Sequence, residues 1–307
     1  MTNSFPMHGK TILITGATSG IGKETARAFA KMGAVTGLVG RNRSKTIESA
    51  NEIIYETANP QVVPFVADLS SQAEVRRLAK EFLERYNRLD VLVNNAGAVF
   101  INRQVSLDGY EMTLALNHLA PFLLTHLLMP ALNASPSARI INVSSEAHRG
   151  THIETENLQN EHGYSGWRAY NQTKLANIYF TYGLAAYVDG ANITANCLHP
   201  GFVASNFGRN NGGIYDPIFR IAHFAAIKPQ VSAGAITYLA TSPDLEGVTA
   251  RYFNRTRETR SSEISYDMNI ARQVWNASLV LTGLAEPESS VLVIPSMTRQ
   301  TTARKVQ

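Results

Sequence analysis

Cysteine is nearly absent from this sequence. Cys197 is the single cysteine among 307 residues, and one thiol excludes an intramolecular disulfide framework. It lies within the apolar run ITANCLHP, which indicates a buried strand position. A chain without disulfides suits a reducing compartment, and we therefore expect a cytoplasmic protein.

Long hydrophobic runs are also missing. The most apolar stretch, APFLLTHLLMPAL, contains a histidine and two prolines, and it is shorter than the roughly 20 apolar residues that a membrane span needs. We assign it to a core helix. The first ten residues, MTNSFPMHGK, contain no apolar segment typical of a signal peptide or membrane anchor. The expectation is a protein without a membrane span.

No segment of the sequence concentrates charges of one sign. The net charge is +4, and the densest basic segment, residues 251–260, is interrupted by Glu258 and by aromatic side chains. We interpret it as solvated surface and expect no nucleic-acid partner. Three histidines, His148, His152 and His162, lie in a polar segment with several glutamates. Their spacing matches no ligand motif, so we expect no metal site.

The sequence does contain an alternation of short β-rich runs and amphipathic helical stretches. Such alternation is typical of a parallel sheet with helices on both faces. The expected fold is α/β, a doubly wound (Rossmann) three-layer sandwich with a mostly parallel central sheet, in a single domain over residues 1–284. Residues 285–307 are expected to form a disordered tail. The expected strands are KTILIT, AVTGLVG, VVPFVA, DVLVNNA, RIINVSS and NITANCL, with helices from Gly20, Ser44, Ser71 and Leu107 and around Tyr170.

A glycine-rich turn follows the first expected strand and opens a helix. Its sequence is TGATSGIG, from Thr15 to Gly22. A strand, a glycine turn and a helix N-terminus are the context that a dinucleotide pyrophosphate requires. The spacing is G-x-x-x-G-x-G rather than G-x-G-x-x-G, and glycine turns also serve only to tighten a strand-to-helix connection. Taken alone, the turn therefore favours a cofactor site without establishing one.

The second expected strand ends without an acidic residue. Its last residues are Val39 and Gly40, followed by Arg41, Asn42 and Arg43. An acidic residue here would bind a ribose 2′-hydroxyl, whereas arginines suit a 2′-phosphate. The pattern indicates NADP(H), and the alternative is that both arginines only face solvent.

Asp68 ends the third strand-like run, where two roles are open to it. It can cap the following helix or contact the adenine of the cofactor. The two roles are compatible, since Ser70 and Ser71 also offer side chains for the cap.

Tyr170 and Lys174 lie four residues apart in a segment of helical composition. Residues at this spacing share one helix face, so the phenol and the ammonium should be neighbours. We expect the positive charge to lower the pKa of the tyrosine and to make it a usable acid near neutral pH. The alternative for an isolated pair of this kind is an ordinary surface contact.

Several motifs occur in the order and at the intervals of one known family. TGATSGIG, Asp68-Leu69, the NNAG segment, Asn117, INVSS, the Tyr170 to Lys174 segment and Pro200-Gly201 cover almost the whole chain. In these features the sequence resembles the short-chain dehydrogenase/reductase family. GIGKETA, SLDGYEMTLALNHL, TKLAN and SPDLEGVTARYF, with a long interval from Ser145 to Tyr170, are similar to its retinol dehydrogenase-like branch.

This resemblance implies roles for individual residues. Tyr170 would exchange a proton with the substrate oxygen, Lys174 would contact the nicotinamide ribose, and Ser145 would orient and polarise the carbonyl. Asn117 would support a water molecule that relays protons. The residues expected to bind the cofactor are Gly16, Thr18, Ser19, Gly20, Ile21, Gly22, Arg41, Asn42, Asp68, Leu69, Asn95, Ala96, Gly97, Tyr170, Lys174, Pro200, Gly201 and Val203.

Together these features predict an NADP(H)-dependent oxidoreductase for the carbonyl or alcohol group of an apolar or aromatic small molecule. Residues 206–227 are expected to form a lid whose apolar helical face closes over the substrate, with packing on the core as the alternative. Two other functions stay open: a C=C reductase on the same scaffold, and an NADP(H)-sensing binding protein without turnover. A serine hydrolase is excluded because Ser145 lies in no nucleophile elbow. A homodimer is compatible with the resemblance.

Overall fold

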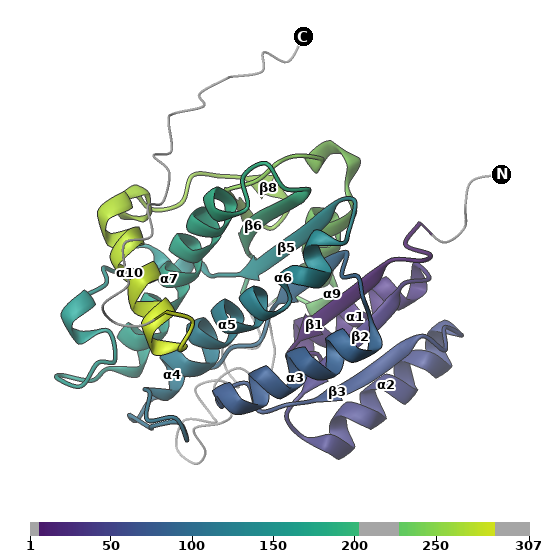
Figure 1. Cartoon of the computed structure of the whole chain (residues 1–307), viewed down its shortest axis with the longest axis horizontal. Helices are drawn as coiled ribbons and strands as arrows, with labels where there is room; N and C mark the ends of the chain where they lie inside the picture. The colour runs from purple at the N-terminus through teal and green to yellow at the C-terminus, as the bar shows by residue number, and fades with distance from the viewer. Residues whose placement is uncertain (1–5, 203–226, 286–307) are drawn as a thin grey trace, which may run out of the picture.

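The computed structural model describes residues 6–202 and 227–285, which form one eight-stranded sheet with helices on both faces (Figure 1). The strand order is β3-β2-β1-β4-β5-β6-β7-β8, and only the last pair is antiparallel. The expected doubly wound α/β fold is confirmed. The strands are β1 (Thr11–Thr15), β2 (Val35–Gly40), β3 (Val62–Val66), β4 (Val91–Asn94), β5 (Ala138–Val143), β6 (Ile193–His199), β7 (Arg251–Asn254) and β8 (Arg257–Glu258).

The central strands are buried on both sides. Successive side chains of β1 point to opposite faces of the sheet: Leu13 joins one buried cluster, and Ile12 and Ile14 join the other. Because helices cover both faces, apolar residues occupy consecutive positions instead of alternating with polar ones. This explains why the sequence shows short continuous apolar runs.

Helices from distant parts of the chain cover each face (Figure 1). The face of Ile12 is covered by α1 (Gly20–Lys31), α2 (Arg43–Thr57) and α9 (Pro229–Thr241). The face of Leu13 is covered by α3 (Gln72–Arg85), α5 (Ala120–Leu127) and α7 (Gly166–Tyr187), and α10 (Met268–Leu281) packs against α7. The short helices are α4 (Met112–Leu114), η1 (Ala115–Leu119), α6 (Met129–Asn133), η2 (Glu146–His148), η3 (Thr155–Asn157), η7 (Pro243–Leu245) and η8 (Glu263–Tyr266).

The arginines of the basic segment 251–260 are exposed, as expected, but the segment is also part of the sheet. It forms β7 and β8, and β7 extends the sheet by pairing in parallel with β6. Tyr252 and Phe253 are buried. The arginines around them point outward, where Arg251 pairs with Glu258 at 3.4 Å. Only two residues of β7 are buried, and two are too few to give the sequence pattern of a strand.

The helix expected from Leu107 begins later. Leu107 lies in a turn and is 95% exposed, and the helical segment starts at Met112. The buried Glu111 caps this start, because its carboxylate accepts hydrogen bonds from the backbone N–H groups of Thr113 and Leu114. The segment then passes through the π-helical turn η1 before it continues as α5.

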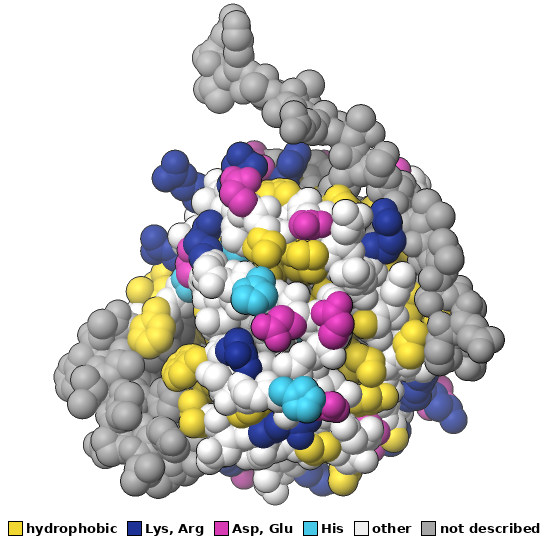
Figure 2. All heavy atoms as spheres, turned by 90° about the vertical axis from the view of Figure 1, so that its left-hand side faces the viewer, with side chains coloured by type: hydrophobic (Ala, Val, Ile, Leu, Met, Phe, Trp, Pro, Cys, Tyr) yellow, Lys and Arg dark blue, Asp and Glu magenta, His cyan; other side chains and the backbone are white. Residues whose placement is uncertain are grey.

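The outer surface carries mixed charges. Figure 2 shows the face that includes α10 and the segment before α7, where acidic, basic and hydrophobic side chains are interspersed. Cys197 is buried in β6, as predicted. Across the two described ranges, no helix is both long enough and apolar enough to cross a bilayer. The expected lid, except for Ile227, and the expected tail, except for residue 285, lie outside the described residues.

Candidate active site

A cavity of about 590 Å³ lies at the carboxyl ends of β1 to β6. It spans the point between β1 and β4 where the strand order reverses, and ligands of open α/β sheets bind at such points. The residues that the sequence predicted for the site and that line this cavity are Gly16, Thr18, Ser19, Gly20, Ile21, Gly22, Arg41, Asp68, Leu69, Asn95, Ala96, Gly97, Ser145, Tyr170, Lys174, Pro200 and Gly201.

Three predicted residues are not part of this lining. Asn42 caps α2 instead, accepting a hydrogen bond from the Lys45 N–H at 3.0 Å. Asn117 is fully buried behind the cavity wall. Val203 lies outside the described residues.

The glycine turn is held closely against the loop after β4. Gly16 has a φ of +66°, which favours glycine, and a Cβ at this position would lie 2.9 Å from the Cα of Ala96. The Thr15 hydroxyl accepts hydrogen bonds from the N–H groups of Asn95 and Ala96. The Asn95 side chain donates in return to the Thr15 carbonyl at 2.8 Å. The two loops therefore form one wall of the cavity.

The N-terminus of α1 is open to an anion. Its N-cap residue, Ser19, makes no side-chain hydrogen bond to the helix, and the first turn contains no acidic residue. The first N–H groups of a helix lack partners within the helix and carry partial positive charge. Because Ser19 to Gly22 line the cavity, these groups fit the pyrophosphate of a dinucleotide.

The end of β2 supplies a cation. Arg41 is exposed and lines the cavity, and its guanidinium makes no hydrogen bond or ion pair with residues 6–202 or 227–285. Arg43 is the first residue of α2 and is not part of the lining. Asp68 lines the cavity too, and its carboxylate accepts hydrogen bonds from the N–H and hydroxyl groups of Ser70. Ser70 precedes Ser71, the N-cap residue of α3, so this contact belongs to the turn before the helix, and contact with the adenine stays a prediction.

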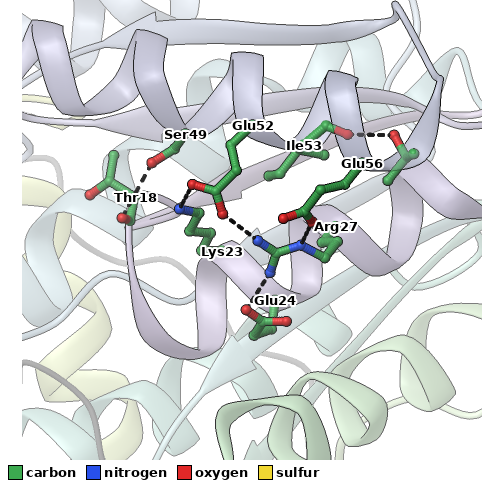
Figure 3. Close-up of polar contacts among 9 residues, drawn as sticks. Thr18, Lys23, Glu24, Arg27, Ser49, Glu52, Ile53 and Glu56 are labelled. Atoms are coloured by element: carbon green, nitrogen blue, oxygen red, sulfur yellow. Dashed lines mark hydrogen bonds and ion pairs between the residues drawn. The ribbon is translucent and has the colours of Figure 1, made fainter.

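A cluster of ion pairs joins α1 to α2 beside the glycine turn (Figure 3). The Lys23 ammonium lies 2.6 Å from a carboxylate oxygen of Glu52. In the same view, the Ser49 hydroxyl donates to the carbonyl of Thr18 at 3.4 Å. Since Thr18 belongs to the glycine turn and lines the cavity, these contacts hold α2 against that turn. The members of the cluster are Lys23, Glu24, Arg27, Glu52 and Glu56.

Tyr170, Lys174 and Ser145 come together at the cavity floor. The Lys174 ammonium lies 5.4 Å from the centre of the Tyr170 ring and donates to the Val143 carbonyl at 3.1 Å. The hydroxyl of Tyr170 is hydrogen-bonded to that of Ser145. The Ser144 hydroxyl donates to the Lys174 carbonyl at 2.8 Å, which fixes α7 against the end of β5. The spacing on one helix face thus brings the predicted pair together.

The expected lowering of the tyrosine pKa is wrong for this structure. Burial raises the pKa of Tyr170 to about 12, and the hydrogen bond with Ser145 offsets only part of this effect. Burial also lowers the pKa of Lys174 to about 8. The low dielectric of the interior disfavours both charged forms, and the ammonium lies near the ring rather than bonding to the hydroxyl.

Asn117 lies in the π-helical turn η1, and π turns occur often at functional sites. Its side-chain oxygen accepts from the Ala98 N–H at 2.9 Å, and its Nδ2 donates to the Ala98 carbonyl at 2.9 Å and to the Thr173 hydroxyl at 3.1 Å. The amide therefore joins the loop after β4 to α7. The side-chain oxygen and nitrogen of Asn117 are thus both hydrogen-bonded to other protein groups.

Part of the cavity lining is an apolar wall that was not predicted from the sequence. Trp167 lies three residues before Tyr170, and their rings meet edge to face with centroids 6.4 Å apart. Because residues three apart share one helix face, the position of Tyr170 could have predicted that Trp167 also lines the cavity. Phe100 and Phe202 lie in loops and give no periodic signal. The wall is formed by Ala98, Phe100, Met112, Leu116, Ala147, Trp167 and Phe202, with His199 as a polar neighbour.

The histidines of the polar segment are dispersed. His148 is buried, and its Nε2 accepts a hydrogen bond from the Ser262 N–H at 3.0 Å. His152 is exposed, and its Nε2 lies 3.4 Å from Oε1 of Glu154. Over the part of the chain that the structure describes, no group of three or more histidine, cysteine, aspartate or glutamate side chains is arranged to hold a metal ion.

Comparisons with known proteins agree with this geometry. The family model described as short chain dehydrogenase matches residues 10–212. Retinol dehydrogenase 14 of Mus musculus is 40% identical over 291 residues, which cover 91% of this chain and 87% of that protein. An uncharacterized protein of Mycobacterium paratuberculosis is 30% identical with a TM-score of 0.72, covering 90% of this chain and 94% of its own. The Pseudomonas aeruginosa RhlG/NADP active-site complex is 26% identical with a TM-score of 0.65, covering 82% and 97%.

Proposed function

Because this chain belongs to the short-chain dehydrogenase/reductase family, in its retinol dehydrogenase-like branch, we propose that it is an NADP(H)-dependent oxidoreductase for apolar or aromatic carbonyl compounds and alcohols. The family alone supports an oxidoreductase that acts on alcohols or carbonyls. The observation that carries the finer proposal is the hydrogen-bonded Ser145 and Tyr170 pair beside Lys174, in the same cavity as the glycine turn.

A bound nicotinamide cofactor supplies the hydride chemistry. In the reducing direction, the Tyr170 hydroxyl donates its proton to the substrate oxygen. The Ser145 hydroxyl binds that oxygen and polarises the carbonyl, and the Lys174 ammonium stabilises the phenolate that proton transfer leaves. The raised pKa of Tyr170 keeps the phenol protonated at neutral pH, so it is ready to act as an acid.

The 2′-phosphate form of the cofactor is supported by the end of β2. A Cβ at Gly40 would lie 2.3 Å from the Thr18 side chain, which leaves no room there for an acidic side chain. Arg41 is a cation at the cavity edge. RhlG, a structural relative, is known as an NADP complex. These three observations support NADP(H) over NAD(H).

Purified protein assayed with a panel of aldehydes, ketones and alcohols would test the proposed function. Consumption of NADPH with carbonyl substrates is the expected result. Consumption only with conjugated alkenes would favour a C=C reductase. Tight NADPH binding without turnover on any substrate would favour a cofactor-sensing protein.

Arg41→Ala should narrow the preference for NADPH over NADH by roughly tenfold or more, because a charge-assisted hydrogen bond contributes about 1.5 to 3 kcal/mol. The measurement is kcat/KM with each cofactor. Arg43→Ala is the matched control, since Arg43 does not line the cavity, and it should leave the ratio unchanged. An equal ratio for wild type and Arg41→Ala would contradict the assignment of Arg41.

A homologous series of aldehydes tests the apolar wall. We expect kcat/KM to rise with chain length by up to roughly fourfold per buried methylene, since each contributes about 0.8 kcal/mol. Trp167→Ala should flatten this dependence, because Trp167 belongs to the wall. Tyr187→Ala, an exposed aromatic residue at the other end of α7, is the control. Equal efficiency for short polar and long apolar aldehydes would refute the substrate class.

A further inference from the structure

The main-chain carbonyl of Asn117 has no α-helical donor. In an α-helix this carbonyl would accept from the residue four positions later, which here is Pro121. Proline has no N–H group. The helical segment passes through this point as the π-helical turn η1. A buried carbonyl that loses its α-helical donor depends on other donors, because a carbonyl left without one is costly.

Asn177 supplies that donor from α7. Its Nδ2 lies 2.9 Å from the Asn117 carbonyl oxygen. Because a carbonyl can only accept, the amide of Asn177 must present its nitrogen to Asn117 and its oxygen to the other side. On that side the oxygen lies 3.1 Å from Nδ1 of His118. His118 must therefore carry a proton on Nδ1.

The second nitrogen of His118 reaches the C-terminal helix. Its Nε2 lies 2.8 Å from the hydroxyl of Ser278 on α10. Burial lowers the pKa of His118 to about 4, so the ring is neutral at physiological pH and Nε2 accepts the hydrogen bond. Asn117, His118, Asn177 and Ser278 are each at most 4% exposed.

This buried series of hydrogen bonds, from Ser278 through His118 and Asn177 to Asn117, reaches the active site at Asn117. The Asn117 amide bonds both the N–H and the carbonyl of Ala98, a residue that lines the cavity. The same amide donates to Thr173, whose hydroxyl donates to the Tyr170 carbonyl at 2.8 Å. A shift of the η1 backbone would therefore move both the loop after β4 and the helical turn that carries Tyr170.

We propose that Asn177, oriented by His118 and Ser278, is a positioning residue of the catalytic centre. It holds the Asn117 carbonyl, which Pro121 deprives of its α-helical donor. By doing so it fixes the amide that joins Ala98 to the Tyr170 helix. The inference rests on the proposed function, because its effect is exerted on the reacting groups that this function assigns.

A positioning role and a purely stabilising role predict different kinetics. Loss of a buried hydrogen bond lowers stability in either case. Only a positioning role lowers the rate of the chemical step while the folded protein still binds NADPH normally. A displacement of reacting groups by about 1 Å can cost ~100-fold in rate, so we expect at least a tenfold loss.

The test compares Asn177→Leu with wild type in single-turnover NADPH oxidation by an aldehyde substrate. The expected result is a rate reduced roughly tenfold or more, with NADPH affinity changed by less than about threefold, since the Asn177 side chain lies outside the cavity lining. Gln172→Leu is the matched control. Gln172 is a buried amide on the same helix, but it bonds to Asn160 and to the His152 carbonyl.

A second pair of variants decides the matter if Asn177→Leu does not fold. His118→Leu removes the donor to Asn177, whereas His118→Asn keeps an N–H group near the position of Nδ1. The proposal requires that single-turnover NADPH oxidation is slow in the His118→Leu variant and close to the wild-type rate in the His118→Asn variant. Equal rates for these two variants, or a folded Asn177→Leu within about twofold of wild type, would overturn the inference alone. A wild type without turnover would instead overturn the proposed function, and this inference with it.

Discussion

Tyr170→Phe is expected to lower turnover by roughly 100-fold or more, the usual effect of removing a positioned general acid. The substitution removes only the hydroxyl that bonds to Ser145. The phenyl ring keeps its packing against Lys174 and Trp167. NADPH binding should therefore remain close to wild type.

The measurement combines steady-state rates with NADPH titration of the same purified variant. Tyr179→Phe is the matched control on the same helix. The Tyr179 hydroxyl donates to the Ile264 carbonyl at 2.7 Å, away from the cavity lining. This control should lose about 1 kcal/mol of stability and keep its turnover. Near-wild-type turnover of Tyr170→Phe would refute the assignment of Tyr170 as the acid.

The pKa values of Tyr170 and Lys174 are shifted in opposite directions in the free protein. Burial raises the pKa of Tyr170 to about 12 and lowers that of Lys174 to about 8. A protonated phenol can donate without a preceding ionisation step. Oxidation of an alcohol needs the phenolate, so it depends more strongly on the positive charge of Lys174.

The sheet was predictable because its strands are buried on both faces. The run KTILIT contains β1, and the five other expected strands likewise contain or overlap β2 to β6. β7 could not be predicted, since only Tyr252 and Phe253 are buried in it and arginines flank them. The position where α4 begins also depends on tertiary structure, because the capping residue Glu111 is buried by contacts that include Tyr164.

The parts of the candidate site that are formed by residues close together in the sequence were predictable. The glycine turn and the Tyr170 and Lys174 pair depend on local spacing, which a sequence shows directly. The environment of Asn117 was not predictable, since its carbonyl donor lies 60 residues away in Asn177. The pKa of Tyr170 was predicted in the wrong direction, because burial raises it by more than the hydrogen bond with Ser145 lowers it, and burial is a property of the folded chain.

Gly22→Ala should weaken NADPH binding by roughly 100-fold or more, because it displaces backbone N–H groups whose bonds to a charged phosphate contribute about 1.5 to 3 kcal/mol each. Gly22 lies in the first turn of α1, at the cavity wall. A Cβ there would lie 2.4 Å from the Gly16 carbonyl oxygen and 2.6 Å from Nδ2 of Asn95. Asn95 holds the Thr15 carbonyl, so the glycine turn and the loop after β4 must separate to make room.

The same crowding should lower the stability of the protein by about 1 to 3 kcal/mol, the usual cost of overpacking. NADPH titration and thermal unfolding measure the two effects. Gly234→Ala is the matched control. Gly234 lies within α9, where an added Cβ meets nothing within 4 Å. Alanine is the better helix former, so this control should gain about 0.5 to 1 kcal/mol and bind NADPH normally. If Gly22→Ala bound NADPH within about threefold of wild type, the glycine turn would not be the phosphate site.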